Sequence, residues 1–558
     1  MKKLNIILIA LFVVLLAGCD KEVDLTNTEI EEIIDVTDTS ENLTDEEIVV
    51  ELNSVVNGII DGEFSFDETY EDYTLDDYQT LDSNSDSFTI THGGVYVLEG
   101  SYTSTITIDA GDEDVDLVLL DATISVTSGP AILVLSGDEI TISAPENTVN
   151  VIEDSANHPL DGEEEYSAAV YSKSDLVFNG TGTITVNGYY NDGIKTKDDI
   201  KIVDVTLEIS SIDDGIVGKD YIAIRDANIS IDSLGDSLSS TNDEDTAKGF
   251  IYIESGTFDF TSDADGIQAE NTVFIYGGTF NIDVSDDGIQ ASTAIYVGGG
   301  TIVITADGDA INTDGELTIY DGDLTVTAGD DALHGYDMVL IEGGTINILG
   351  SYEGIEGLVI IINGGTINIV ASDDAINATV GGGQIHGPTY VALGGSITIN
   401  GGIIQISSVG DGIDSNGDVI MTGGYLIVYG PVTDMESTID YDGTFEISGG
   451  LVIAIGSDGM LQSLSEESTQ NSLVYANGET FDVGTMVTLT DSEDNVVLEI
   501  QAIKDIEAVV ISCEEMVNGE SFTLTVGSET YDFTITSTIT SLGAGAGTSD
   551  QIGKPPGR

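Results

Sequence analysis

The stretch Ser285-Asp286-Asp287-Gly288-Ile289-Gln290 recurs, with small changes, every 22 residues through the middle of the chain. It reads Asp213-Asp214-Gly215-Ile216 earlier and Asp330-Asp331-Ala332-Leu333 later. The small residue of this acidic phrase occupies positions 193, 215, 237, 266, 288, 310, 332, 354, 375 and 412. Six of these nine intervals are 22 residues, and the intervals of 29 and 37 fit repeats that carry insertions. A fixed period of this size indicates stacked units, each of which contacts its neighbours.

One repeat, residues 272–292, shows how each unit is expected to fold. Thr272–Tyr276 and Thr279–Val284 are expected strands separated by Gly277-Gly278, and a third strand is expected from Gly288 to Ala291. Alternating apolar side chains, glycine turns and many β-branched residues favour three short strands per repeat. The sequence therefore predicts an all-β parallel β-helix with about 22 residues per coil. Propeller blades, which need about 40 residues, do not fit this period.

The composition limits the partners of the chain. Its 558 residues include 101 acidic and 13 basic residues, which gives a formal net charge of −88. Nucleic acid is excluded as a partner, because contacts to phosphates require clustered Lys and Arg. Hydrophobic residues make up 41% of the chain, which is typical of a folded protein and not of an acidic disordered one. We expect a monomer whose acidic surface is surrounded by divalent ions or salt.

The N-terminus has the features of a bacterial lipoprotein signal. Lys2 and Lys3 precede an apolar run from Ile6 to Leu16, which is too short to cross a bilayer. The run ends in Leu16-Ala17-Gly18-Cys19, which resembles a lipobox with cleavage before Cys19 and a lipid on its sulfur. We expect an exported protein, anchored by lipid to the outer face of the cytoplasmic membrane. An ordinary secretory signal with an incidental cysteine is the alternative.

Changes in pattern along the chain predict five segments. A signal peptide (1–18) is followed by an acidic flexible tether (19–85), the parallel β-helix (86–460), a small non-repeating C-terminal β module (461–540) and a disordered tail (541–558). We expect the β module to cover the open end of the β-helix, where strand edges would otherwise be unpaired.

Two columns of side chains follow the acidic phrase. The residue after the small residue is always Ile or Leu, and we expect this column to lie in the core. Because side chains alternate along a strand, the next residue is expected to face outward. This outward column contains Lys195, Val217, Ser239, Gln268, Gln290, Asn312, His334, Glu356, Asn377 and Asp414. Polar groups spaced by ~4.8 Å suit an extended polymer of hydroxyls, so Gln268, Gln290, Asn312, His334 and Asn377 are candidate substrate-binding residues. A solvated sheet face with stacked amides is the alternative.

The acidic turns predict bound cations. Carboxylates ~5 Å apart repel by about 1 kcal/mol in water and by about 3 to 4 kcal/mol at an effective dielectric near 20. Two oxygens each ~2.4 Å from Ca²⁺ span about one coil spacing, and hard oxygen donors disfavour zinc or copper. We expect several Ca²⁺ ions held by Asp213, Asp214, Asp236, Asp286, Asp287, Asp309, Asp330, Asp331, Glu353, Asp373, Asp374 and Asp411. The alternative is a solvated acidic turn whose Asp side chains support the backbone through hydrogen bonds.

Four of the few basic residues share one register. Lys173, Lys197, Lys219 and Lys248 are separated by 24, 22 and 29 residues. One interpretation is a cationic strip that pairs with the carboxylates of an acidic polysaccharide. The other is local neutralisation of the acids beside each lysine.

Several stretches carry a resemblance to a known family: Ser172–Leu176, Asp214–Asp220, Ser351–Gly357, Ala371–Ala378, Ile439–Phe445 and Ile455–Met460. They resemble bacterial carbohydrate-binding proteins with a right-handed parallel β-helix, typified by clostridial proteins that bind cellulose and pectin. The resemblance covers roughly residues 85 to 540. It implies calcium in the coils, polysaccharide binding and a fold shared with pectate lyases. The chain has no Trp, so sugar stacking would depend on Tyr, Phe or His.

Three functions stay open at this point. The first is a cell-surface lipoprotein that binds a pectin-like polysaccharide or cellulose on a calcium-loaded β-helix, without catalysis. The second is a calcium-dependent lyase of the pectate type, with Lys195, Lys197 or Lys219 as the base. The third is an adhesin or structural rod that needs no sugar. No cluster breaks the repeat as a catalytic site should, which favours binding. Carboxylate pairs recur on every coil and therefore do not identify a glycosidase pair.

Overall fold

The computed structural model describes residues 6–8, 44, 48–50, 53, 79–81, 88–159, 166–379 and 394–543. The chain divides into two compact units, a first unit of Leu43–Leu349 and a second unit of Met1–Asn42 with Gly350–Arg558. Cys19 and nearly all of the expected signal peptide, tether and tail lie outside the described residues, so those assignments stay predictions. No helix in the described ranges is long and apolar enough to cross a membrane.

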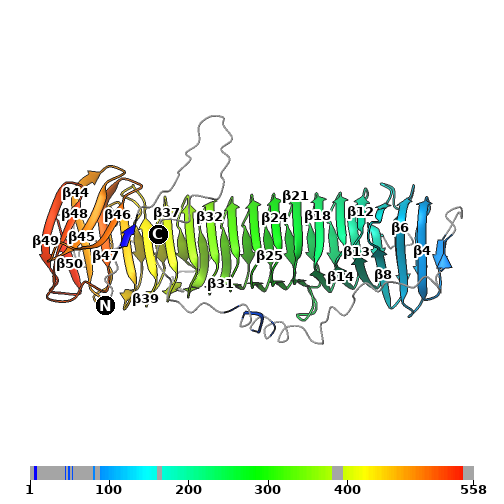
Figure 1. Ribbon diagram of the computed structural model, residues 1–558, viewed down its shortest axis with the longest axis horizontal. Helices are drawn as coiled ribbons and strands as arrows, with labels where there is room; N and C mark the ends of the chain where they lie inside the picture. Colours follow the sequence, from blue (N-terminus) through cyan, green and yellow to red (C-terminus); the bar gives the residue numbers. More distant parts are fainter. Residues whose placement is uncertain are drawn as a thin grey trace, which may run out of the picture. The chain divides into compact units, whose positions relative to one another are not determined.

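The first unit is built from three parallel sheets in which each strand pairs with the strand one turn further along, as the stacked strands of Figure 1 show. Sheet 1 contains β9 (Val149–Glu153), β12 (Thr183–Gly188), β15 (Thr206–Ser211), β18 (Ala227–Ser233), β21 (Gly256–Ser262), β24 (Thr279–Val284), β27 (Thr301–Ala306) and β30 (Asp323–Ala328). Sheet 2 contains β3 (Phe88–Ile90), β5 (Ile106–Asp109), β7 (Ile132–Ser136), β10 (Ala168–Ser172), β13 (Asp192–Thr196), β16 (Ile216–Gly218), β19 (Leu238–Ser240), β22 (Ile267–Ala269), β25 (Ile289–Ala291) and β28 (Ile311–Thr313). Sheet 3 contains β8 (Glu139–Ala144), β11 (Asp175–Gly180), β14 (Asp199–Val203), β17 (Tyr221–Arg225), β20 (Phe250–Ile253), β23 (Thr272–Ile275), β26 (Ala294–Val297) and β29 (Glu316–Ile319).

A few longer strands join or extend these sheets. The strand β6 (Val115–Ser125) pairs with β8 of sheet 3 and β9 of sheet 1. The strand β31 (Leu333–Ile341) pairs with β28 of sheet 2 and β29 of sheet 3. At the N-terminal side, β2 (Gln79–Thr80) and β6 both pair with β4 (Gly94–Tyr102). The strand β32 (Thr345–Ser351) contains the boundary between the two units.

The strand register reproduces the sequence period. Ile289 pairs with Ile311 and Ile282 with Ile304, so partners are 22 residues apart. The expected strands of residues 272–292 correspond to β23, β24 and β25. Gly278 and Gly300 adopt φ angles of 123° and 104° at the turn that precedes sheet 1, a region that favours glycine. The prediction of a parallel β-helix, with about 16 turns in all, is confirmed.

The Ile and Leu column lies in the core, as predicted. Ile267, Ile289 and Ile311 are each 0% exposed, and so are the corresponding residues of the other turns. Full burial of one such side chain contributes about 1.5 to 3 kcal/mol. The column therefore fixes which residues of each phrase point inward and leaves the acidic residues at the turn between sheets 1 and 2.

The second unit repeats this pattern and then changes it. Its parallel strands are β33 (Ile355–Ile362), β34 (Thr366–Ala371), β35 (Ile376–Ala378), β36 (Ser396–Ile399), β37 (Ile403–Ser408), β38 (Ile413–Ser415), β39 (Val419–Met421), β40 (Tyr425–Tyr429), β41 (Ile439–Tyr441), β42 (Phe445–Ile447) and β43 (Leu451–Gly456). The strand β47 (Ile506–Ser512) pairs antiparallel with β43 and with β44 (Ser472–Phe481), and β50 (Ile539–Leu542) pairs with β44. The regular parallel stacking therefore ends at β43.

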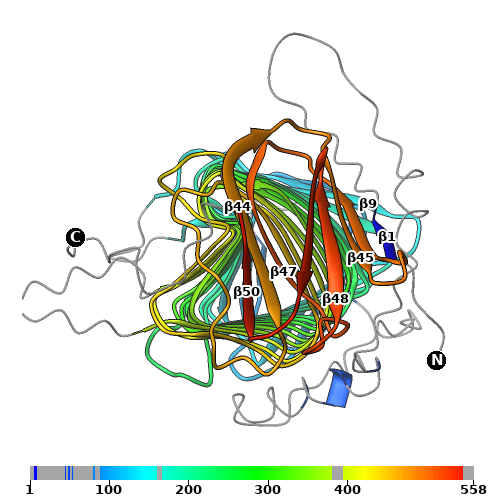
Figure 2. The same cartoon turned by 90° about the vertical axis from the view of Figure 1, so that its left-hand side faces the viewer.

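A second, smaller sheet belongs to the same unit, and its strands β45 and β48 are seen lengthwise in Figure 2. Its order is β1 (Ile6–Leu8), β46 (Val496–Gln501), β45 (Met486–Asp491), β48 (Ser521–Val526) and β49 (Glu529–Thr534). Lys504 follows β46, and its Nζ donates to the carbonyl oxygens of Ser408, Tyr429 and Gly430, the last two at 3.1 and 3.3 Å. Burial lowers the pKa of Lys504 to about 8. This lysine ties the non-repeating part to the last parallel turns of its unit.

Candidate functional site

The second acidic residue of each phrase forms a column that we call the carboxylate ladder. In the first unit it contains Asp192, Asp214, Asp236, Asp265, Asp287, Asp309 and Asp331. Each carboxylate from Asp214 to Asp309 accepts the backbone N–H of the next ladder residue. Oδ1 of Asp287, for example, accepts the N–H of Asp309 at 2.8 Å. One oxygen of these side chains therefore supports the adjacent turn, as the hydrogen-bonding alternative anticipates, and Oδ2 faces other partners.

Several of those partners are residues of the expected outward column. Asn312 Nδ2 donates to Oδ2 of Asp287 at 2.7 Å, and Lys195 Nζ lies 2.6 Å from Oδ2 of Asp192. In the second unit Asn377 Nδ2 donates to Oε2 of Glu353 at 2.8 Å. These side chains are partly or largely buried, so their polar groups supply hydrogen bonds to the ladder. Sequence reasoning placed them on an open face and missed this contact.

The other column residues vary in exposure. Gln268 and Gln290 are half-buried and lie directly across from each other in the register of β22 and β25. Ser239 donates to Oε1 of Gln268 at 3.0 Å, while Val217 is buried. The stacked amides of the first unit are therefore present, and part of their hydrogen-bonding capacity is used within the column.

In the second unit, an aspartate stands at the position where Asn312 supplies a hydrogen-bond donor in the first unit. Carboxylate oxygens of Asp374, Asp411 and Asp414 lie within 4.8 Å of one another. Oδ1 of Asp374 also accepts the N–H of Asp411 at 2.6 Å. Asp414 occupies the position that Asn312 has in the first unit, three residues after a ladder residue. The sequence analysis counted Asp374 and Asp411 as metal ligands and left Asp414 out.

Burial makes this acidic cluster hard to ionise. Desolvation, followed by the charges of neighbouring carboxylates, raises the pKa of Asp374 to about 6, that of Asp414 to about 7 and that of Asp411 to about 8. In the first unit burial likewise raises the pKa of Asp214 and of Asp265 to about 7. Without a cation, these groups would hold protons near neutral pH.

The first acidic residue of each phrase is more accessible. Asp286 and Asp330 are exposed, whereas Asp213 and Asp373 are half-buried. Oxygens of Asp192, Asp213 and Asp214 lie within 4.8 Å of one another. The structure thus brings Asp213 and Asp214 together with Asp192, which the sequence analysis had not counted as a ligand although it stands in the same phrase.

The lysine register lies beside a second acidic cluster that the sequence analysis missed. Asp175, Asp198 and Asp199 gather within 4.8 Å, and burial raises the pKa of Asp199 to about 7. Lys248 forms an ion pair with Asp220, which also accepts Asn242 Nδ2 at 2.6 Å. The signal was present in the sequence, because each lysine of the register except Lys248 precedes an aspartate by one or two positions.

The other lysines of that register are placed differently. Lys197 is exposed and Lys219 is half-buried. The Nζ atom of Lys173 lies 5.6 Å from the centre of the Tyr166 ring. The lysines are therefore close to acids or an aromatic ring, and Lys197 is the most accessible of the four.

Aromatic side chains form a cluster on sheet 3, but it is covered. The rings of Phe274 and Tyr296 stack with centres 5.6 Å apart. Ile48 packs against this cluster and is only 3% exposed, and Asn53 Oδ1 accepts the hydroxyl of Tyr276 at 3.0 Å. Sugar stacking on this face would require Ile48 and Asn53 to move away.

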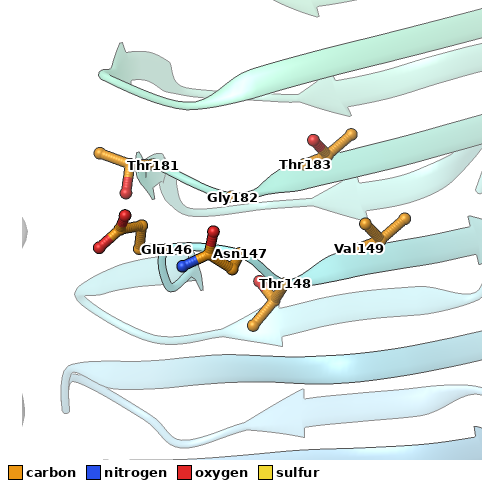
Figure 3. Close-up of a pocket in the computed structure, with 7 residues that line it drawn as sticks. All are labelled: Glu146, Asn147, Thr148, Val149, Thr181, Gly182 and Thr183. Atoms are coloured by element: carbon orange, nitrogen blue, oxygen red, sulfur yellow. The ribbon is translucent and has the colours of Figure 1, made fainter.

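A hollow of about 640 Å³ lies away from the ladder, at turns that precede sheet 1 (Figure 3). Its lining is hydroxyl-rich and has a single acidic residue, and consists of Glu146, Asn147, Thr148, Val149, Thr181, Gly182 and Thr183. It lacks the paired carboxylates that could hold a cation. The ladder, which runs along the turns, is the better candidate for an extended ligand.

Fold and site define a parallel β-helix protein with carboxylates stacked at the same turn of successive coils from Asp192 onward. The chain belongs to the family described as carbohydrate-binding domain-containing proteins, which matches residues 84–332 and 284–434. A carbohydrate-binding domain-containing protein of Acetivibrio thermocellus is 27% identical over 157 residues, which are 27% of this chain and 54% of the relative. The match thus spans about half the length of that relative. A solved structure of a polysaccharide lyase-like protein from C. thermocellum, a gadolinium derivative, is 26% identical and covers 41% of this chain and 86% of its own, with a TM-score of 0.34.

Proposed function

We propose that this protein binds an acidic polysaccharide without cleaving it, with calcium ions on the carboxylate ladder taking part in binding. Membership of a carbohydrate-binding family supports the sugar as ligand. The ladder supports the cation, because a repeated column of oxygen donors at one turn of each coil suits an ion that prefers oxygen ligands.

The cluster of Asp374, Asp411 and Asp414 is the observation that carries the cation part of the proposal. The carboxylates of buried Asp411 and half-buried Asp374 and Asp414, which lie within 4.8 Å of one another, are costly to ionise together unless a cation is shared. Asn377 stands directly across from Asp414 in the register of β35 and β38. Its Oδ1 is buried and has no hydrogen-bond partner among the described residues. These side chains would hold a calcium ion, which would supply positive charge to neutralise both the cluster and a sugar carboxylate.

The placement of the candidate bases favours binding over lyase chemistry. Nζ of Lys195 is committed to the buried carboxylate of Asp192 at 2.6 Å. Lys197 is exposed, and Lys219 is half-buried with its charge beside Asp220, so neither lies in the apolar surroundings that let a lysine act as a base. We therefore assign Lys197 and Lys219 to attraction of an anionic polymer.

A retention experiment tests this function. Calcium-loaded protein should be retained on immobilised polygalacturonate, with weaker retention on cellulose, and EDTA should release it. An Asp411→Asn/Asp414→Asn variant should lose most of the calcium-dependent retention. Asp283→Asn, which removes an exposed charge on β24, is the matched control and should bind normally. Retention that ignores EDTA would contradict the role of calcium, and rising ultraviolet absorbance from an unsaturated product would replace binding with lyase activity.

We also propose that the protein is anchored to the outer face of the membrane through a lipid on Cys19. The support is in the sequence alone: Lys2 and Lys3, the apolar run Ile6–Leu16 and the residues Leu16-Ala17-Gly18-Cys19 occur in the order of a lipoprotein signal. Such an anchor would place the β-helix where it meets extracellular polymers.

A further inference from the structure

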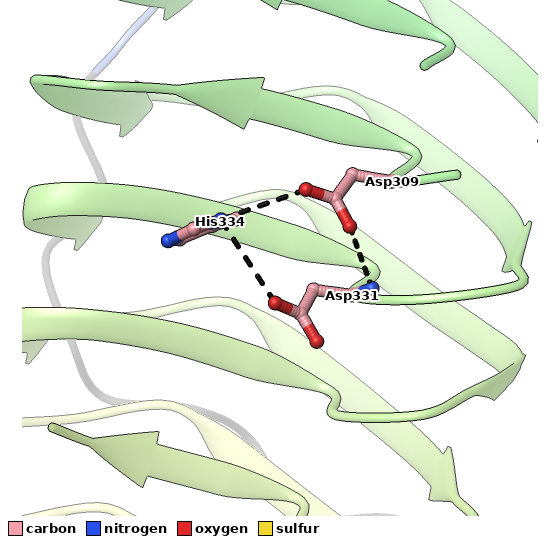
Figure 4. Close-up of side chains that lie close together, drawn as sticks. All are labelled: Asp309, Asp331 and His334. Atoms are coloured by element: carbon pink, nitrogen blue, oxygen red, sulfur yellow. Dashed lines mark hydrogen bonds and ion pairs between the residues drawn. The ribbon is translucent and has the colours of Figure 1, made fainter. Parts of the chain in front are cut away.

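His334 is the only histidine in the column that follows the carboxylate ladder. It pairs in register with Asn312 of the preceding turn, where the column residue is an amide. Figure 4 shows the His334 ring between the carboxylates of Asp309 and Asp331. Its Nδ1 lies 3.5 Å from Oδ2 of Asp309 and 3.9 Å from Oδ2 of Asp331. The side chains of His334, Asp309 and Asp331 are only 20%, 10% and 9% exposed, respectively, so little solvent separates them.

These separations are long for hydrogen bonds. In the turn before, Asn312 Nδ2 approaches Oδ2 of Asp287 to 2.7 Å, so the same backbone geometry allows close contact. A charged imidazole that served only as counter-charge would be expected at about 2.7 to 2.9 Å from a carboxylate oxygen. Two donor atoms that are each ~2.1 Å from one tetrahedral ion lie about 3.4 Å apart. The spacing of His334 from Asp309 and Asp331 fits a shared ion better than a direct ion pair.

The orientation of the carboxylates is also fixed in advance. Oδ1 of Asp309 accepts the N–H of Asp331 at 2.8 Å, which leaves Oδ2 turned toward the imidazole. Hydrogen bonds of this kind orient ligands in metal sites and raise their affinity. Imidazole with carboxylate suits ions such as Zn²⁺ and Co²⁺, whereas Ca²⁺ takes oxygen ligands.

We propose that Asp309, Asp331 and His334 form a binding site for a divalent transition-metal ion of the zinc class, so that at this turn the two ladder carboxylates expected to bind calcium hold a different ion. The ligand atoms are Oδ2 of each aspartate and Nδ1 of the histidine. Three protein ligands leave a tetrahedral ion one position for water or for a sugar hydroxyl. The site goes beyond the proposed function and does not depend on it, because the imidazole nitrogen of His334 selects an ion of the zinc class over Ca²⁺.

Cobalt titration of the calcium-depleted full-length protein tests the site, because Co²⁺ bound to mixed nitrogen and oxygen ligands absorbs visible light. The wild-type protein should develop visible bands with one equivalent of Co²⁺, and Zn²⁺ should abolish them while Ca²⁺ should not. His334→Asn places at this position the residue type of the preceding turn. It should weaken Co²⁺ binding by more than about 100-fold, which is a larger loss than the removal of a residue that only supports a metal ligand would cause. His334→Gln, which copies Gln290, repeats the test in case one replacement perturbs folding.

The matched control is His92→Asn, because His92 is exposed and far along the chain from the ladder turn. It should retain the cobalt spectrum. Absence of visible bands in the wild-type protein, or bands that persist in both His334 variants, would overturn the proposal. Calcium-dependent retention of the wild-type protein on polygalacturonate is measured separately. If the wild-type protein is not retained, the proposed function is wrong, and the cobalt result stands by itself.

Discussion

The side-chain amide of Asn312 donates to the carboxylate of Asp287, which belongs to the preceding turn, at 2.7 Å. The other oxygen of Asp287 accepts the backbone N–H of Asp309 at 2.8 Å. Both oxygens of this carboxylate thus have protein donors, so the proposal of a calcium ligand has less support at Asp287 than at the cluster of Asp374, Asp411 and Asp414. At two other turns the amide donor that corresponds to Asn312 is replaced, by His334 in the first unit and by Asp414 in the second. The ladder carboxylates at those turns therefore have a different neighbour.

Asn312→Asp is expected to create a new calcium position. The substitution removes the donor to Asp287 and adds a negative charge, so in EDTA it should destabilise the protein by about 1 to 3 kcal/mol. Calcium should restore most of this loss, and one more equivalent of calcium should bind. Thermal unfolding with and without calcium, together with equilibrium dialysis, measures both effects. The converse variant Asp414→Asn should lose bound calcium, and equal calcium stoichiometry in the two variants would contradict the prediction.

The pH dependence of stability in EDTA follows from the second-unit cluster. The folded state raises the pKa of Asp374, Asp414 and Asp411 to about 6, 7 and 8, above the unfolded value. The folded state therefore binds more protons, and its stabilisation is fully present below the unfolded pKa and is lost as pH rises through the folded values. Urea unfolding should show the free energy of unfolding falling between about pH 4 and pH 8. A flat profile in EDTA would show that these carboxyls are ionised at little cost.

Calcium should reverse that trend, because it stabilises the ionised carboxylates. Its effect on the urea midpoint should be small near pH 5 and large near pH 8, where the ligands are deprotonated. The Asp411→Asn/Asp414→Asn variant serves as the control and should show a weak calcium effect at either pH.

Ile48→Asp is expected to expose the aromatic cluster against which Ile48 packs. Ile48 is 3% exposed and packs beside Tyr252 and Tyr296, so a carboxylate at this position would be buried without a partner. Acrylamide quenching of tyrosine fluorescence should increase as the rings become accessible. Val50→Asp is a matched control, since Val50 is 67% exposed and should tolerate the charge. Equal quenching in the two variants would argue against the covering role of Ile48.

Cys19→Ser is expected to abolish lipid attachment. Cells expressing the wild-type protein should incorporate labelled palmitate into it and retain it in the membrane fraction. The variant should incorporate none. Cys513→Ser removes the only other mature cysteine, which is buried, and should leave labelling unchanged. Labelling that survives Cys19→Ser would refute lipidation at this position.

The sequence was sufficient for the fold because its signal is periodic. The Ile column at positions such as 267, 289 and 311 and the glycine turns at 278 and 300 repeat in one register, and parallel pairing places each repeat above the last. The carboxylate ladder was equally visible as a column. The acidic phrase could not show whether the side chains of the outward column face solvent or point toward the carboxylate ladder.

The missed features depend on contacts that have no period. Asn312 reaches back to Asp287, and the choice between that contact and solvent is made by side-chain geometry at the turn. The packing of Ile48 on the aromatic cluster joins a non-repeating segment to residues about 200 positions later. Asp414 was overlooked because it was read as one of the outward residues, although it stands three residues after Asp411, the spacing of Asn312 from Asp309.

The regular spacing of the ladder from Asp265 to Asp309 has a consequence for any polymer that lies along it. These three consecutive turns offer similar carboxylate and amide groups one translation apart, so a chain of matching repeat can occupy several equivalent positions. Three equivalent positions add a statistical factor of RT ln 3, about 0.65 kcal/mol, to the binding free energy. A bound chain can then slide by whole repeats without leaving the protein, and an irregular residue such as His334 acts as a stop that marks one position among many.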